Sequence, residues 1–537
     1  MTTLDPHQIE MNSLKTYASH QSSKNPKVGI IGGGIGGLMS ACLLATDGYE
    51  VHLFEKNSDL GGKMGEYTKE GFRFDTGPSL LTMPFLLERF FKTCGTTLEN
   101  TLELVPVEPI CRYNYPDGTL FDCFENDELS VKEIERIAPE DSKAYQDFLA
   151  YISKLYNKTA DAFLYNPLDS LSDLKGLSIQ SFFAIDAFTS VSSVIDKKFS
   201  SEYLRLFFKR FTTYNGSSPY LAPGTLNVIP HVELNIGGYY IKGGMRRLVD
   251  ELIQLATHLG VFIHTECDIQ KIVTHKRKGK TIVHALQVAS RTPIEATNPA
   301  QHTNSENNPY LFECDVVVSN SDAYETYQKL LDRSSISYFN HIQTEKSEPS
   351  CSGFVLFLGL NRSYPQLKHH NIFFSEDYQK EFEDIFNNKV LPKDPTIYVA
   401  NTSHTDPNHA PGNGSNLFVL VNAPYLTKEQ ELLEREHYAD MIIDHLENRG
   451  LHDLRNHIVV KHIRTPYYFY QKYRSNKGSI YGTSSNGLFS AFLRPRNRTR
   501  GIKGLFHTGG SVHPGGGIPL VLQSAFNVQM LVQRHHD

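Results

Sequence analysis

The stretch Lys27-Val-Gly-Ile-Ile-Gly-Gly-Gly-Ile-Gly-Gly37 decides the fold class of this chain. Its first five residues predict a short buried strand, and its glycines predict a tight turn that opens a helix over Leu38–Asp47. The next strand, Val51–Phe54, ends at Glu55. Strand, glycine turn, helix, strand and acid together predict an α/β fold that begins with the βαβ unit of a Rossmann-like nucleotide-binding domain.

The glycines of this turn have separate roles in holding a dinucleotide. In the GxGxxG pattern, Gly32 permits the turn, Gly34 lets a pyrophosphate approach the backbone, and Gly37 allows helix and strand to pack closely. Gly36 lies in the same turn, and the helix N-terminus that follows supplies partial positive charge for phosphates. Glu55 is the acid that we expect to bind the ribose hydroxyls.

A second glycine pair follows this acid and favours FAD over NAD. The stretch Lys56-Asn-Ser-Asp-Leu-Gly-Gly-Lys-Met64 places Gly61, Gly62 and the basic residue Lys63 where a simple NAD domain would continue into a helix. A second close phosphate contact predicts a larger, buried dinucleotide. The doublet resembles the signature of the flavin amine-oxidase and phytoene-desaturase superfamily.

Four further stretches narrow the resemblance to the phytoene-desaturase type of carotenoid desaturases. They are Gly71–Leu80 (GFRFDTGPSL), Thr213–Tyr220 (TYNGSSPY), Gly237–Arg246 (GGYYIKGGMR) and His507–Leu520 (HTGGSVHPGGGIPL). The resemblance covers nearly the whole chain from Lys27 onward, and its most specific element is HPGGGxP. It implies non-covalently bound FAD, an apolar tunnel for a polyene, and desaturation of that polyene.

The resemblance also implies which residues contact FAD. Ser79 and Leu80 would approach the flavin ring, Ile269 would offer its backbone to adenine, and Gly510–Ile518 would cradle the ribityl chain and flavin. For Leu80 and Ile269, an ordinary core position explains the apolar side chain equally well. Beyond the first glycine turn and Glu55, the positions assigned to the cofactor site are Lys56, Gly62, Lys63, Ser79, Leu80, Ile269, Asn320, Gly510, Gly517 and Ile518.

The implied reaction needs few protein groups. Dehydrogenating a C–C unit removes a hydride equivalent, which a flavin accepts, and a proton from the adjacent carbon. The candidates for a base are His231 and Glu233, which lie between two family motifs, and His513, which lies beside the flavin turn. A hydrogen-bonded structural role explains each of them as well, so no catalytic residue is assigned from the sequence.

Composition excludes several classes of protein and partner. The formal net charge of -6 argues against a nucleic-acid partner. The seven cysteines are scattered without the spacing of zinc ligands, which predicts a reducing cytosol and no structural metal. Val28–Thr46 and Gly509–Gln533 approach the length of a membrane span but are too rich in glycine and polar residues to face lipid. We therefore expect a cytoplasmic protein.

One nucleotide domain interrupted by a second domain is the expected organisation, because glycine turns occur near both ends of the chain. The FAD-binding domain would combine residues 27–100, 237–325 and 475–537. A mixed α+β substrate domain would combine residues 101–236 and 326–474, after a mobile extension over residues 1–26. Phe and Tyr make up roughly a fifth of Tyr145–Tyr240, which predicts a large apolar ligand there.

A carotenoid is insoluble in water, so we expect the protein to associate peripherally with the inner face of a membrane. A helix over Ser201–Thr212, capped by Ser200, would place one apolar face and several basic groups at the surface. That face either enters the lipid headgroups or packs inside the substrate domain. The apolar residues are Leu204, Phe207, Phe208 and Phe211, and the basic ones are Arg205, Lys209 and Arg210.

Several functions are compatible with these patterns. The narrowest expectation is 3,4-desaturation of a 1-hydroxylated acyclic or monocyclic carotenoid, because Phe74–Leu81 resembles the hydroxycarotenoid 3,4-desaturase branch. The alternative substrate is phytoene or another acyclic carotene, and the electron acceptor is oxygen or a quinone. HPGGGIP argues against an amine or protoporphyrinogen oxidase. The alternative of a different class is a non-catalytic lipid carrier of the GDP-dissociation-inhibitor type, which predicts a colourless protein.

Overall fold

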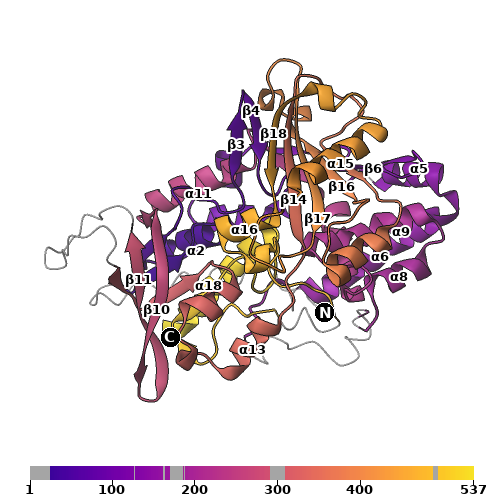
Figure 1. Ribbon diagram of the computed structural model, residues 1–537. Coiled ribbons are helices and arrows are strands. Elements are labelled where there is room, and N and C mark those ends of the chain that lie inside the picture. Colours follow the sequence, from indigo (N-terminus) through magenta and orange to yellow (C-terminus); the bar gives the residue numbers. More distant parts are fainter. Residues whose placement is uncertain are drawn as a thin grey trace.

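The computed structural model describes residues 25–125, 127–160, 164–169, 186, 188–290, 309–487 and 494–536, and Figure 1 shows the path of the chain. All but the last two residues of the extension predicted over residues 1–26 lie outside the described residues.

A five-stranded parallel sheet forms the nucleotide-binding layer. Its order is β20-β13-β1-β2-β9, and each neighbouring pair is parallel. The strands come from widely separated parts of the chain: β1 (Lys27–Ile31), β2 (Glu50–Phe54), β9 (Phe262–His264), β13 (Val316–Ser319) and β20 (Leu505–His507). The runs in β1 and β13 are apolar and buried because both faces of a parallel sheet are covered.

Three helices cover one face of this sheet: α2 (Ile35–Thr46), α11 (Arg246–His258) and α18 (Ile518–His536). They share one core cluster with β1 and β13, to which Val28, Leu248 and Leu522 contribute. Helix α2 begins three residues before the expected helix, at the first glycine motif, and is buried from Gly36 to Leu44. It therefore lies between the sheet and the other two helices rather than at the surface.

The other face packs against a second, smaller sheet. Its members are β10 (Cys267–Arg277), β11 (Lys280–Ser290), β12 (Tyr310–Glu313) and β19 (Ile502–Lys503). Ile31, Phe54 and Val317 from the parallel sheet share a core cluster there with Ile269 and Leu286. The parallel sheet is thus buried between helices and strands.

A seven-stranded mixed sheet belongs to the rest of the molecule. In order, it contains β18 (Ile458–Arg464), β14 (Ser352–Leu360), β17 (Ser415–Ala423), β16 (Ile397–Asn401), β15 (His370–Phe373), β6 (Cys111–Asn114) and β7 (Leu120–Cys123). One of its core clusters includes α15 (Arg435–Asn448), and another includes α6 (Ser142–Thr159), α8 (Val191–Lys198) and α9 (Glu202–Lys209). In Figure 1 these last three helices lie at the opposite side of the molecule from α2 and α11.

One short hairpin, one pair of strands distant in sequence and two further helices complete the fold. The hairpin is β3 (Glu66–Lys69) with β4 (Phe72–Asp75), and the antiparallel pair is β5 (Leu104–Pro106) with β8 (Tyr239–Ile241). The helices are α3 (Pro84–Thr93) and α16 (Pro466–Tyr473). The ring of Phe74 on β4 contacts that of Phe357 on β14 with centroids 5.6 Å apart. The architecture is the predicted Rossmann-like layer joined to a mixed α+β part, while the domain boundaries stay a prediction.

Helix α9 decides between the two alternatives for its apolar face. It ends at Lys209, and Arg210–Asn215 continues as a 3-10 helix. The apolar residues Leu204, Phe207, Phe208 and Phe211 are at most 1% exposed. Of the two alternatives for this face, packing inside the molecule is therefore the one that the structure shows, because these side chains lie in the aromatic core.

The basic residues of this segment are also paired rather than free to meet lipid. Lys209 pairs with Asp196 at 2.7 Å, and Arg210 pairs with Glu233 at 2.5 Å. Arg205 lies 2.5 Å from Glu202. Elsewhere too, no helix among the described residues has the length and hydropathy of a membrane span.

Candidate functional site

The first glycine turn connects the carboxyl end of β1 to α2. Gly32 has φ +92°, a conformation that favours glycine. A Cβ atom on Gly37 would lie 2.1 Å from the Gly32 carbonyl oxygen, so only glycine fits at this close approach of helix and strand. No side chain caps α2 at Gly34. The N–H groups of its first turn are therefore directed at an open end that suits an anion.

Glu55 lies beside this turn, at the position expected for the acidic side chain that binds the ribose hydroxyls. Its Oε2 accepts a hydrogen bond from Gly33 N at 2.8 Å, and its Oε1 accepts hydrogen bonds from Asn57 N and Nδ2 at 2.9 and 2.6 Å. The residue is 7% exposed. Since each carboxylate oxygen can accept more than one hydrogen bond, the acid keeps capacity for ribose hydroxyls.

The glycine doublet packs directly against the first turn. Gly61 N donates to Gly33 O at 2.8 Å, and a Cβ atom on Gly62 would lie 3.2 Å from Gly34 Cα. Both doublet glycines have positive φ. Two motifs that are separated in the sequence by α2 and β2 thus pack against each other.

Asn320, at the carboxyl end of β13, joins the first turn to the C-terminal one. Its Nδ2 donates to Gly32 O at 3.3 Å, and its Oδ1 would lie 2.7 and 2.5 Å from Cβ atoms on Gly36 and Gly509. A Cβ on Gly36 would also lie 3.1 Å from Gly509 Cα. The N-termini of α2 and α18 therefore meet at this edge of the sheet.

The C-terminal turn ends at the start of α18. Gly510 is partly accessible, and Ile518 begins the helix. Gly517 is exposed with φ +97°, and a Cβ atom there would have no atom within 4 Å. Two converging helix N-termini create positive potential without any charged side chain. This cradle, narrow enough to exclude a Cβ and rich in backbone N–H groups, fits a dinucleotide such as FAD.

Lys63 lies deep beside this cradle. Its Nζ donates to Ile480 O at 2.8 Å, and Ser479 O is 3.5 Å away. Burial lowers the pKa of the ammonium to about 8, against an opposing effect of Asp322, yet part of the residue remains accessible. The ammonium of Lys63 is therefore held by backbone carbonyls beside the cradle, where a phosphate-binding role places a cation.

We predict that FAD affinity depends on pH through Lys63. Without FAD the ammonium has a pKa of about 8, so above that pH the diphosphate must bind together with a proton. The affinity should be constant below pH 8 and fall by up to about tenfold per pH unit above it. Titrations of apoprotein with FAD between pH 7 and pH 10 measure this dependence.

Two variants serve as controls for that titration. Lys63→Arg should bind FAD with little dependence on pH, because a guanidinium stays protonated. Lys63→Met should bind weakly at every pH. A wild-type affinity that is unchanged between pH 7 and pH 9.5 would remove Lys63 from the phosphate site.

Ser79, which the resemblance assigns to the flavin ring, belongs to a chain of polar groups. Ser79 Oγ lies 2.5 Å from Tyr398 OH, which lies 2.8 Å from His370 Nδ1. Burial lowers the pKa of His370 to about 3, so its ring is neutral, and its Nε2 has no hydrogen-bond partner. Leu80, next in the chain, packs on Gly238, whose Cβ would lie 2.8 Å from Leu80 Cδ1.

Ile269 and Lys56, which were assigned to the cofactor site, lie in different surroundings. Ile269 is buried in the same core cluster as Phe54, directly before Glu55, and Cys267 N donates to Glu55 O at 2.9 Å. Lys56 Nζ instead donates to Gln471 O at 3.3 Å, so the structure does not bring it to Lys63.

The three candidates for a base have structural surroundings. Glu233 pairs with Arg210 and also accepts a hydrogen bond from Tyr214 OH. His513 Nε2 donates to Asn166 O at 2.8 Å, and burial lowers the pKa of His513 to about 4. His231 lies against Tyr156 with ring centroids 4.6 Å apart, and its buried Nδ1 has no partner. These contacts favour the structural role for Glu233 and His513.

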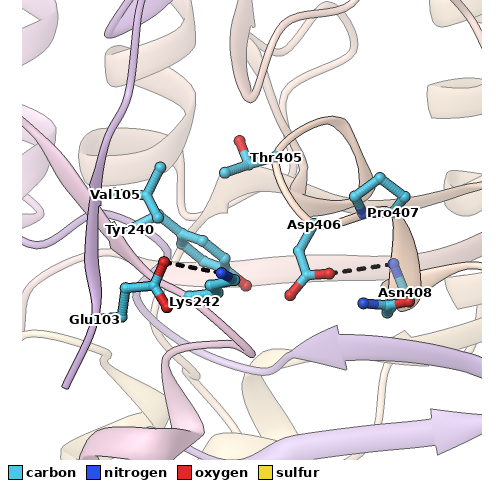
Figure 2. Close-up of a pocket in the computed structure, with 8 residues that line it drawn as sticks. All are labelled: Glu103, Val105, Tyr240, Lys242, Thr405, Asp406, Pro407 and Asn408. Atoms are coloured by element: carbon cyan, nitrogen blue, oxygen red, sulfur yellow. Dashed lines mark hydrogen bonds and ion pairs between the residues drawn. The ribbon is translucent and has the colours of Figure 1, made fainter. Parts of the chain in front are cut away.

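A surface pocket of about 320 Å³ lies apart from the cradle, between β8 and the loop around Asp406. Figure 2 shows that its charged side chains are already engaged: Lys242 pairs with Glu103 at 2.9 Å, and Asp406 Oδ1 accepts a hydrogen bond from Asn408 N. Tyr240 and Lys242 of the stretch Gly237–Arg246 line it, but no residue of the first glycine turn, of the doublet or of the C-terminal turn does. We therefore place the candidate cofactor site at the glycine cradle and not in this pocket.

Comparisons with known proteins agree with this geometry. A family model described as flavin containing amine oxidoreductase matches residues 35–528. The 4,4'-diapolycopene oxygenase of Methylomonas sp is 35% identical over 507 residues, which cover 94% of this chain and 97% of that protein. The 4,4'-diaponeurosporene oxygenase of Staphylococcus haemolyticus is 34% identical over 511 residues, covering 94% and 96%.

Solved structures with low identity share the fold. A putrescine oxidase variant superposes with a TM-score of 0.62 at 13% identity, covering 95% of this chain and 99% of its own. An oxidoreductase from Methanosarcina mazei gives a TM-score of 0.56 at 17% identity, covering 94% and 100%. The predicted fold class is confirmed. The chain belongs to the flavin containing amine oxidoreductase family, in the phytoene-desaturase-type superfamily that its motifs resemble, and it is an oxidoreductase with FAD as its cofactor.

Proposed function

We propose that this protein oxidises an acyclic carotenoid near one end of the polyene. The observation that carries the proposal is the 35% identity, over 94% of the chain, to an enzyme named for 4,4'-diapolycopene. Membership of an oxidoreductase family disfavours the non-catalytic carrier.

The residues around the flavin-side turn suit this substrate. FAD, when bound, accepts a hydride equivalent from the substrate carbon. A Cβ on Gly516 would lie 3.2 Å from Tyr481. Aromatic side chains exclude water from this region, while Ser79, Tyr398 and His370 add one polar contact. That contact supports an end group that carries or acquires oxygen.

Two reactions at such an end group remain to be distinguished. The names of the relatives favour oxygenation of the end group, whereas Phe74–Leu81 favours the 3,4-desaturation of a 1-hydroxylated carotenoid. Expression in hosts that supply single carotenoids, with and without a 1-hydroxyl, decides between them by product mass. Desaturation removes two hydrogen atoms, while oxygenation under ¹⁸O₂ adds a labelled atom. Reduction of the flavin by small amines with carotenoids left unchanged would refute both.

Membrane association and the electron acceptor belong to the same proposal. The substrate must come from a bilayer, so we expect peripheral binding at the inner face of a membrane, through a surface other than α9. Flotation with anionic liposomes tests the binding. Reoxidation rates with oxygen and with a quinone, measured separately, identify the acceptor.

We predict that Tyr398→Phe lowers turnover at least tenfold while the flavin content stays unchanged. The variant keeps the ring but removes the hydroxyl between Ser79 and His370. Both polar groups then lose their hydrogen-bond partner, and each unsatisfied group costs about 1–3 kcal/mol of free energy. Product formation per bound flavin measures the effect. Tyr378→Phe is the control, because the buried Tyr378 hydroxyl has no partner and its loss should be neutral. Equal activity in both variants would separate Tyr398 from the reaction.

A further inference from the structure

Two buried cations hold one chain segment beside the C-terminal glycine turn. Lys63 donates to Ile480 O, as described above. Arg494 Nη1 donates to Gly510 O at 2.8 Å and lies 3.4 Å from Tyr481 O, while its Nη2 donates to Thr483 O at 3.0 Å. Arg494 is only 7% exposed. Its guanidinium therefore connects the segment 479–483 to the turn at Gly510.

The segment and the turn pack closely around the guanidinium. A Cβ on Gly482 would lie 2.6 Å from Ser511 Cα, so the segment presses directly on the turn. A Cβ on Gly515 would lie 3.8 Å from both Cζ and Nη1 of Arg494. The charge is thus fixed against the turn that ends at the N-terminus of α18.

This charge has no ion-pair partner among the residues that the structure describes. Its three hydrogen bonds go to backbone carbonyls. The carboxylate that raises the pKa of both Arg494 and Lys63 is Asp322, which itself accepts hydrogen bonds from Tyr324 N and Asn476 N. Burial has the larger, opposite effect and lowers the pKa of Arg494 to about 10. Two cations and one carboxylate leave an excess of positive charge in the interior.

An uncompensated buried charge is costly, and an anionic ligand relieves that cost. FAD supplies a diphosphate, which Lys63 and the helix N-termini suit. Transfer of two electrons and one proton to its ring adds one further negative charge. We propose that Arg494 tunes the bound FAD by stabilising the negative charge that the ring gains on reduction. This inference rests on the cofactor and not on the carotenoid reaction.

The test compares Arg494→Gln and Arg494→Lys with the unaltered FAD-loaded protein. Each is reduced stepwise without oxygen, in the presence of a reference dye, and the equilibrium between oxidised and reduced flavin is read from absorbance. We expect Arg494→Gln to disfavour the reduced form about tenfold, which for a two-electron couple is about 30 mV. It should also bind sulfite about tenfold more weakly, because the sulfite adduct carries a similar charge. Arg494→Lys should stay within threefold of the unaltered protein.

Arg464→Gln is the matched control. Arg464 is also 7% exposed, lies on β18 over the rings of Phe357 and Tyr468, and should leave the flavin equilibrium unchanged. If Arg494→Gln and Arg494→Lys leave the equilibrium unchanged while both lower thermal stability, Arg494 only ties two turns together and the proposal is overturned. Where a variant releases FAD, separate dissociation constants for oxidised and reduced FAD give the same ratio.

Discussion

Gly37→Ala is expected to give a colourless protein with strongly lowered thermal stability. The new Cβ would lie 2.1 Å from the Gly32 carbonyl oxygen, a backbone atom at the start of the turn. Relief requires α2 to move away from β1, which opens the cradle and overpacks the core at a cost of about 1–3 kcal/mol or more. Flavin absorbance per protein and thermal unfolding measure both effects.

Gly353→Ala is the control for this substitution. Gly353 lies on β14, and its new Cβ would meet Leu420 Cδ1 at 3.4 Å, an ordinary contact with a side chain that can adjust. That variant should keep its flavin. Full flavin content in Gly37→Ala would show that FAD does not depend on the close approach of helix and strand.

Removing Arg210 is expected to destabilise the aromatic core severely. Arg210 and Glu233 pair at 2.5 Å with side chains that are 6% and 3% exposed, and Arg210 also donates to Tyr113 OH. Arg210→Met leaves the Glu233 carboxylate buried without its cation, which costs about 3–5 kcal/mol. Denaturant unfolding measures the loss.

A double variant separates lost pairing from lost packing. Arg210→Met with Glu233→Leu removes both charges and should recover most of the lost free energy of unfolding. Arg205→Met, at the exposed pair with Glu202, should cost less than about 1 kcal/mol. If the double variant is as unstable as Arg210→Met, packing around the guanidinium and not the pair stabilises this core.

The parts of the fold that the sequence predicted are those whose pattern lies within one short stretch of the chain. β1, α2, β2 and Glu55 follow one another within 29 residues, so strand periodicity, glycines and the acid mark them directly. The strands β13 and β20 are short buried runs, and their pairing with β1 depends on contacts across hundreds of residues. Boundaries also shifted: the helix expected over Leu38–Asp47 begins at Ile35 and ends at Thr46.

The missed site residues have no motif of their own. Arg210 looked like a surface cation because helical spacing places it off the apolar face, yet it pairs with Glu233, 23 positions away. Tyr398 and Arg494 act through partners more than ten residues distant. Asp322 could have been predicted from the sequence, because it follows β13 by three residues, at the carboxyl edge where parallel sheets bind ligands.

The order of the five-stranded sheet has a consequence for synthesis on the ribosome. Its central strand, β1, is among the first elements to emerge, but its neighbour β13 follows almost 300 residues later and β20 almost 200 residues after that. At about 5–20 residues per second, β1 and its glycine turn wait for tens of seconds without their neighbours. The start of α18 leaves the ribosome later still. Cofactor loading must therefore be a late event, and a chaperone that shields α2 and β1 during elongation should raise the yield of flavin-loaded protein.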